Sequence, residues 1–288
     1  IGVNAYDASD TEDDNIAIGY NAMTVNTAGG VENVAVGNYA LDALTSGDGN
    51  TAVGHSAGTG ITTGINNTNF GRGGGGGITS GDGNVAIGHD ILSGTTTGDF
   101  NVYIGQSNGD SGVTGSNNIA IGYHAGRSDS PSGTITSNSN RLCLGNGSIS
   151  NAHIQVDWTV ASDKRDKTDV KPVKMGLDFV NKLEPVTYHW DKRVKYVEDG
   201  ADFTSIIHDG THKEDWRDVG FLAQDVEKLE EEYGHKISDK SNLTTSKNED
   251  GAYGLTYAKF VPILTKAIQE LSAKVEAQQS EIDTLKNA

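Results

Sequence analysis

The sequence predicts a mainly β repeat solenoid, a trimeric β-roll or β-helix, followed by an α+β domain that ends in a long coiled-coil helix. Three observations predict this fold class. Of the 38 glycines among 288 residues, 31 lie in residues 1–161. A short pattern repeats through that part, and an apolar heptad runs through the C-terminal end. So sharp a change in composition excludes a single globular domain.

The repeat has the form Asn-apolar-x-apolar-Gly. Clear copies begin at Asn15, Asn33, Asn84, Asn101 and Asn118, a variant begins at Asn50, a degenerate copy spans 69–73, and 142–145 is a final copy. The steps from the first Asn to the sixth following copy are 18, 17, 19, 15, 17 and 17 residues. Each copy predicts a three-residue strand with its branched residues on one face, closed by a glycine turn. Strands this short bury their apolar face only by stacking, so we expect a solenoid assembled as a trimer.

Several residues in this half have two interpretations. The glycine run 71–77 can be read as G-x-G-x-x-G, but no βαβ unit surrounds it, so a tight loop is favoured over a dinucleotide site. His55 and His89 follow repeat glycines and could bind a metal at a threefold axis, although a surface or stacking role is favoured. Asp48 and Asp82 lack the dense spacing of a calcium loop and are interpreted as turn residues. We therefore expect no metal and no cofactor.

Charge, hydropathy and cysteine content exclude several classes of partner and of covalent cross-link. The net charge of −17 divides into −11 for residues 1–161 and −6 for residues 162–288, and an acidic chain repels nucleic acid. No apolar run approaches the roughly 18 residues that span a bilayer, so no membrane insertion is expected. Cys143 stands alone, which excludes an intrachain disulfide and predicts a buried small residue. Because residue 1 is Ile, we expect the true N-terminus to lie upstream.

The junction after Trp158 carries candidate chemistry. Ser162 and Lys167 lie five residues apart and can form a Ser-Lys dyad, in which the lysine amine takes the serine proton. The amine must be unprotonated to do so, a state that burial and the neighbouring cations Lys164 and Arg165 favour. On spacing alone, a solvated charged linker explains this run better.

Four sequence motifs, or blocks, that follow one another along the chain favour the catalytic interpretation. They are Ser162-Asp163-x-Arg165-x-Lys167-x-x-Val170, Leu183-Glu184-Pro185-Val186-Thr187-Tyr188-x-Trp190, Gly220-Phe221-Leu222-Ala223-Gln224-Asp225-Val226 and Tyr257-x-x-Phe260-Val261-Pro262-x-Leu264. They resemble the intramolecular chaperone domain at the C-termini of phage tailspikes and tail fibres, the peptidase S74 or endosialidase chaperone family. Val170 replaces the usual Ile. The repeats of residues 15–145 resemble the heads of trimeric autotransporter adhesins and some phage tail fibres.

The resemblance implies a division into a fibre segment, 1–161, and a self-cleaving chaperone domain, 162–288. It implies that Ser162 is the nucleophile, that Lys167 is its general base, and that Ala161-Ser162 is the scissile bond, with Asp163 and Arg165 in supporting roles. The implied assembly is a homotrimer in a virion tail fibre, built in the host cytoplasm. Its partners would be a host receptor, either a glycan or a surface protein, and upstream tail proteins.

Three alternatives stay open: a cell-surface trimeric adhesin with the same chaperone, a non-cleaving structural fibre, and a tailspike whose carbohydrate-cleaving part lies upstream. A missing anchor or virion-attachment region upstream of Ile1 would separate the first of these from a tail fibre.

The C-terminal segment 257–288 is predicted to be a long helix. Apolar residues and one glutamine alternate at steps of four and three residues, at Leu264, Ile268, Leu271, Val275, Gln278, Ile282 and Leu285. A helix packed on its own domain explains three of these positions equally well, but a self-associating coiled coil explains all seven. Three such helices would hold three fibre chains together while their strands find register.

Overall fold

A computed structural model describes residues 1–6, 14–25, 29–94, 96–109, 111–130, 132–196, 206–248 and 251–287. Contacts divide the chain into two compact units. The first unit comprises Ile1–Ala152 and Lys192–Ile207, and the second comprises His153–Asp191 and His208–Ala288. The functional division at residues 161 and 162 stays a prediction.

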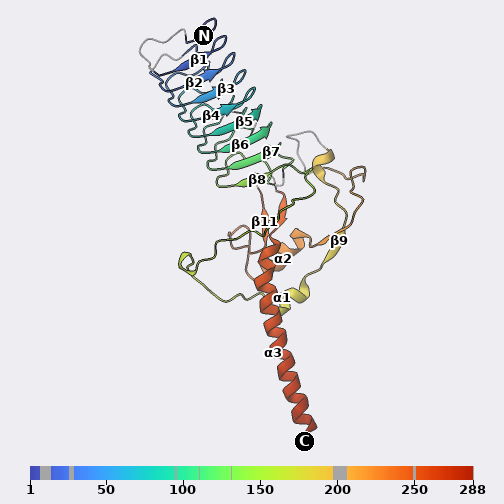
Figure 1. Cartoon of the computed structure of the whole chain (residues 1–288). Coiled ribbons are helices and arrows are strands. Elements are labelled where there is room, and N and C mark those ends of the chain that lie inside the picture. Colours follow the sequence, from blue (N-terminus) through green and yellow to red (C-terminus); the bar gives the residue numbers. More distant parts are fainter. Residues whose placement is uncertain are drawn as a thin grey trace. The chain divides into compact units, whose positions relative to one another are not determined.

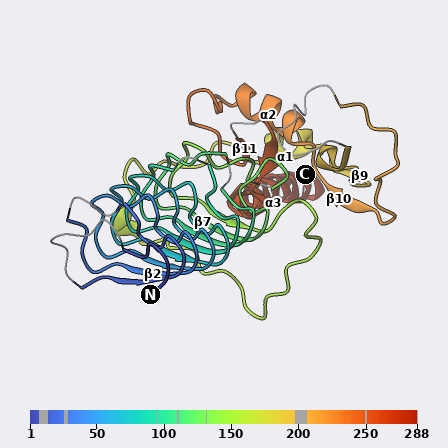
Figure 2. The same cartoon turned by 90° about the horizontal axis from the view of Figure 1, so that it is seen from above.

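The first unit is the predicted solenoid. Eight short strands form one parallel sheet in chain order: β1 (Ile16–Ile18), β2 (Val34–Val36), β3 (Thr51–Val53), β4 (Thr68–Phe70), β5 (Val85–His89), β6 (Val102–Gln106), β7 (Ile119–Tyr123) and β8 (Leu142–Leu144). Each strand pairs only with the strands of the preceding and following coils, and the coils stack one behind another (Figures 1 and 2). The solenoid prediction is therefore confirmed.

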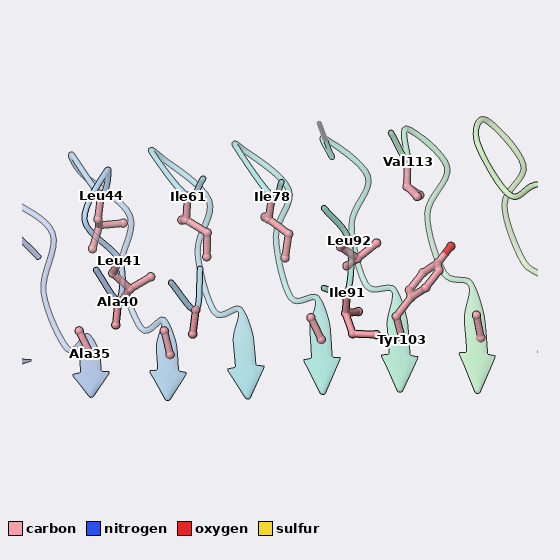
Figure 3. Close-up of a cluster of buried hydrophobic side chains, with 14 of the residues drawn as sticks. Ala35, Ala40, Leu41, Leu44, Ile61, Ile78, Ile91, Leu92, Tyr103 and Val113 are labelled. Carbon is pink, nitrogen blue, oxygen red and sulfur yellow. The ribbon is translucent and has the colours of Figure 1, made fainter. Parts of the chain in front are cut away.

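The middle residue of each five-residue repeat, which is the second residue of its strand, faces the solenoid interior. Ala35, Ala52 and Ala86 are fully buried, while the branched residues on either side are partly or largely exposed. The return stretches supply larger side chains such as Ile61 and Ile78 to the same interior (Figure 3). The small middle residue leaves room for these side chains, and the exposed branched residues form an apolar stripe along the sheet.

The first residue of each repeat builds a ladder of buried asparagines. In one rung, the Asn84 amide donates to Asn67 Oδ1 at 3.1 Å and to the Gly98 carbonyl at 2.9 Å. Asn67 Oδ1 also accepts the Asn84 backbone N–H at 2.9 Å. The same pattern runs through Asn33, Asn50, Asn67, Asn84, Asn101 and Asn118. Asparagine serves here because its side chain carries both a donor and an acceptor.

The fourth copy begins at Asn67, so the prediction that it spans 69–73 is wrong. Thr68 pairs with Thr51 and with Val85, which places Asn69 in the middle position normally held by alanine. The uneven steps of 19 and 15 residues are therefore two steps of 17. A Cβ on Gly75 would lie 1.8 Å from Asn69 Oδ1. The glycine run thus makes room for a larger interior side chain, in agreement with its prediction as a tight loop.

The turn residues connect successive coils. Asp48 Oδ1 accepts the Val31 N–H at 2.9 Å, and Asp82 Oδ1 accepts the Ile65 N–H at 2.8 Å, which confirms their prediction as turn residues. His55 lies edge-on to Tyr39, with ring centroids 5.7 Å apart. Cys143 is buried, as predicted. Within the described ranges, no group of three His, Cys, Asp or Glu side chains could hold a metal ion.

The second unit is a small α+β domain with one long helix. Its elements are η1 (Lys164–Asp166), α1 (Leu177–Lys182), β9 (Val186–Tyr188), β10 (Asp218–Gly220), α2 (Ala223–Glu232), β11 (Thr245–Lys247), β12 (Tyr253–Leu255), η4 (Tyr257–Lys259) and α3 (Phe260–Lys286). The segment η2 (Arg193–Tyr196) belongs to the first unit. The core of the second unit contains Met175, Phe179, Val226, Leu229, Phe260 and Ile263. Only the first turns of α3 reach this core, and the rest continues as one unbroken helix (Figure 1).

Candidate functional site

The structure brings Ser162 and Lys167 together. Lys167 Nζ lies 2.6 Å from Ser162 Oγ and donates to the Ser162 carbonyl at 3.1 Å. The first distance is within the reach that proton transfer between a nucleophile and its base requires. The amine therefore lies beside the hydroxyl that follows the predicted scissile bond.

A short turn holds this geometry. η1 lies between the two residues, and the Lys167 N–H donates to the Lys164 carbonyl at 3.2 Å. Asp163 caps the turn by accepting the Arg165 N–H at 2.9 Å, and Arg165 Nη2 donates to Asp163 Oδ2 at 2.6 Å. The side-chain and then the backbone hydrogen bonds from Arg165 lower the pKa of Asp163. Asp163 thus contacts Arg165, and it orients Lys167 only through the turn.

In the single chain this site is open to solvent. Residues 161–170 are all exposed, including Ser162 and Lys167. The chain's own fold therefore does not supply the burial expected to favour an unprotonated amine. The Arg165 cation, expected to favour the same state, is paired with the Asp163 carboxylate. Burial of the Ser162-Lys167 pair would therefore require a surface that covers this turn.

The other three blocks form the body of the domain. Val186 of the second block pairs with Gly220 of the third through the antiparallel strands β9 and β10. The Phe221 N–H donates to Tyr257 Oη at 3.1 Å, which joins the third block to the fourth. A Cβ on Gly220 would lie 2.3 Å from Tyr257 Oη, so this close contact requires glycine. Packing of the second, third and fourth blocks against one another therefore accounts for these residues.

We expect Gly220→Ala to destabilise the domain by about 1–3 kcal/mol, the usual cost of overpacking. Tyr257→Phe removes the oxygen that the new methyl would meet, so the two substitutions combined should cost less than the sum of the two single changes. Urea unfolding of both single variants and the double variant measures this coupling. Strict additivity would show that Tyr257 is not what requires glycine at position 220.

Two structural carboxylates, those of Glu230 and Glu270, carry no recognisable signal in the sequence. Glu270 accepts the Leu177 N–H at 2.8 Å and so caps α1, and this hydrogen bond is the main reason that its pKa is lowered. Glu230 is fully buried and accepts hydrogen bonds from Thr244 Oγ1 and Thr245 Oγ1. Gly176 precedes α1 and lies against the same carboxylate, because a Cβ at this position would be 2.3 Å from Glu270 Oε2.

The fold and the site define a class of protein: a β-solenoid followed by a small α+β domain that opens on a Ser-Lys pair. Residues 162–235 match the model of the Peptidase S74 family, described as chaperone of endosialidase. The chain is similar to this family over these residues, and this match confirms the resemblance. The match begins at Ser162. The fourth block lies beyond the matched range. No curated protein and no solved structure matches the chain. Among the described residues, no helix is long and apolar enough to cross a membrane.

Proposed function

We propose that this chain is part of a trimeric phage tail fibre, and that its chaperone domain releases itself by cutting the Ala161-Ser162 bond. The family similarity supports a folding and trimerisation role for the domain. The observation that carries the cleavage proposal is the 2.6 Å contact between Ser162 Oγ and Lys167 Nζ. It occurs at the first residue of the family match.

The proposed reaction uses only the chain's own groups and water. Ser162 Oγ attacks the Ala161 carbonyl carbon while Lys167 Nζ takes the hydroxyl proton. The carbon–nitrogen bond then breaks, and Lys167 returns the proton to the departing amide nitrogen, leaving an ester between Ala161 and the serine oxygen. Water hydrolyses the ester and leaves a carboxylate on Ala161 and a free amine on Ser162. The chain presents its own bond, so it needs no substrate pocket.

The exposed dyad makes assembly the step that activates cleavage. Ser162 and Lys167 approach each other within one short turn, so a single chain already pairs them. Both side chains are exposed to solvent in the single chain. A trimer that covers the turn would remove water and favour the neutral amine. Cleavage would then follow assembly, and an unassembled chain would stay whole.

The long helix supports self-association of the chains. α3 packs on its own domain through Phe260, Ile263 and Ala267, all of them buried. Its apolar heptad residues lie elsewhere on the helix and are each at least 43% exposed: Leu264, Ile268, Leu271, Val275, Ile282 and Leu285. Packing within the domain therefore does not account for the heptad, and the coiled coil is the better explanation.

The solenoid offers a second surface for self-association. Its apolar stripe includes Ile16, Ile18, Phe70, Ile87, Ile119, Ile121, Leu142 and Leu144, which are between 39% and 55% exposed. A continuous apolar stripe of this kind marks an interaction surface. Because it recurs once per coil, the same stripe on identical chains can be covered at every level of the stack. We assign it to the contact between copies.

The fibre assignment places the mature segment 1–161 on the virion, where it would contact a host receptor, a glycan or a surface protein. Upstream tail proteins would attach it to the particle. This proposal rests on the solenoid's stacked repeat structure and on the family's association with phage tail proteins.

The test of cleavage is intact-mass analysis of the purified chain and its variants under conditions where it trimerises. We expect the unchanged protein to yield a product of residues 1–161. Ser162→Ala and Lys167→Ala should yield none, because each removes one partner of the dyad. Lys171→Ala is the matched control, since this exposed lysine lies near the dyad and outside it.

The product mass separates the possible outcomes. A trimer that never yields residues 1–161 would contradict autoproteolysis and leave a non-cleaving chaperone. A cut that persists in Ser162→Ala would assign the cleavage to another protease. Equal losses in Lys171→Ala and Lys167→Ala would show that Lys167 has no particular role.

A further inference from the structure

Residues 153–161 have the pattern of a β-strand but form none in the single chain. Apolar residues alternate with polar ones: Ile154, Val156, Trp158 and Val160 are separated by Gln155, Asp157 and Thr159. An alternation with period two is typical of a strand that has one apolar and one polar face. The segment nevertheless forms neither helix nor strand.

The apolar side chains of this segment are among the most exposed of the described residues. Ile154 is 53% exposed, Trp158 69%, Val156 72% and Val160 79%. Across 153–161, no described backbone group makes a hydrogen bond and no described side chain makes an ion pair or ring contact. Such a segment has both the backbone groups and the apolar face of a strand that lacks its partner.

The position of the segment in the chain indicates which partner it has. It lies between the solenoid's last strand, β8, whose Leu142 and Leu144 are exposed, and the domain that carries the heptad helix. Both flanking parts carry the surfaces assigned above to contacts between copies. When those surfaces join, the same segment of each chain is brought to a high local concentration. A second copy is therefore the partner that the assembly itself supplies.

We propose that residues 153–161 become a β-strand only in the trimer, where they pair with the same segment of the other copies. Ile154, Val156, Trp158 and Val160 then form a shared apolar core, and Gln155, Asp157 and Thr159 face water. This inference rests on the proposed trimer.

The strand would also link assembly to cleavage, because it ends at Ala161. Once the strand is paired, the carbonyl that Ser162 attacks belongs to fixed backbone. After the cut, the strand remains as the C-terminal segment of the fibre product, and the domain that begins at Ser162 leaves. The strand's apolar core would then hold the ends of the three mature chains together without the chaperone.

Hydrogen–deuterium exchange on the full chain tests this proposal, with Ser162→Ala keeping every chain whole. Light scattering on the same sample gives the oligomeric state. In the trimer we expect the amides of 153–161 to exchange at least about 100-fold more slowly than those of an unstructured peptide. In a variant that stays monomeric, they should exchange at the unstructured rate.

Two matched variants test which face is buried. Val156→Lys places a charge on the apolar face and should abolish the protection, whereas Gln155→Lys places the same charge on the polar face and should retain it. Trp158 gives a second signal, because its fluorescence should shift to shorter wavelength on assembly in the unchanged segment and in Gln155→Lys only.

The outcomes distinguish failure of the strand from failure of the trimer. A trimer in which 153–161 exchanges like a free peptide overturns the strand and leaves the trimer standing. Protection in a monomer also overturns it, because the partner would then lie within the same chain. A chain that stays monomeric with no protection overturns the trimer and the strand together.

Discussion

Asn67→Ala should lower the free energy of unfolding by about 3 kcal/mol, whereas Asn69→Ala, two residues along the same coil, should raise it by about 1 kcal/mol. Both side chains are fully buried amides in the solenoid interior. The opposite signs follow from their hydrogen bonds. Asn67 is a rung of the ladder, and Asn69 occupies a position that alanine holds in the neighbouring coils.

Removing the Asn67 amide breaks two hydrogen bonds to the following coil. The Gly81 carbonyl loses its 2.8 Å donor, and the Asn84 backbone N–H loses its 2.9 Å acceptor. Each buried polar group left without a partner costs about 1–3 kcal/mol. Truncating one rung should therefore weaken the stacking of the fourth and fifth coils.

For Asn69, the cost of burying the amide exceeds the stability that its side chain contributes. Among the described residues, neither its nitrogen nor its oxygen has a hydrogen-bond partner. Alanine removes that desolvation cost and leaves a void the size of an amide group, which costs about 1 kcal/mol. The relief of two unsatisfied polar atoms exceeds the cost of the void, so the protein gains stability.

Thermal and urea unfolding of the uncleaved Ser162→Ala chain measures both changes in one background. Each variant is the control for the other, since both replace a buried asparagine of the fourth coil by alanine. Equal destabilisation would contradict the hydrogen-bond explanation and show that filled volume alone decides. A large loss of stability on Asn69→Ala alone would show that its amide is satisfied in solution.

The solenoid was predictable because its repeat is regular enough to read from sequence. The clear copies and the glycines defined the coils, and the spacing of five residues between Ser162 and Lys167 allowed the two side chains to pair. The fourth copy was misplaced because Asn67 and Asn69 both fit the first position of the pattern. Only a strict step of 17 residues, which the pairing of Thr68 with Thr51 and Val85 enforces, chooses between them.

Side-chain partners were less predictable than strands. Asp163 could have paired with Lys164, Arg165 or Lys167 on spacing alone, and the geometry of η1 selects Arg165. The contacts of Glu270 with Leu177 and of Glu230 with Thr244 join residues far apart in the chain or across a loop. No local sequence pattern predicts these two contacts, because they depend on how α1, α2 and α3 pack.

Val275→Asp should convert the trimer into a monomer, because it places a charge in the apolar seam of three associating helices. Val275 lies about two turns beyond Ala267, the last residue of α3 that is buried in the domain, so the domain itself should fold normally. Ala273→Asp puts the same charge on an exposed position of the same helix outside the heptad, and it should remain a trimer. Light scattering at micromolar concentration gives the mass of each variant.

The heptad also makes the number of chains a sharp test. Ile268, Val275 and Ile282 alternate with leucines in the order that favours two-stranded coiled coils, with Gln278 as a polar interruption. The helix alone would thus favour a dimer, and the third chain must be imposed by the solenoid stripe. An unchanged protein that is a dimer would contradict the trimeric fibre. A trimer that survives Val275→Asp would show that the solenoid holds the chains together without the helix.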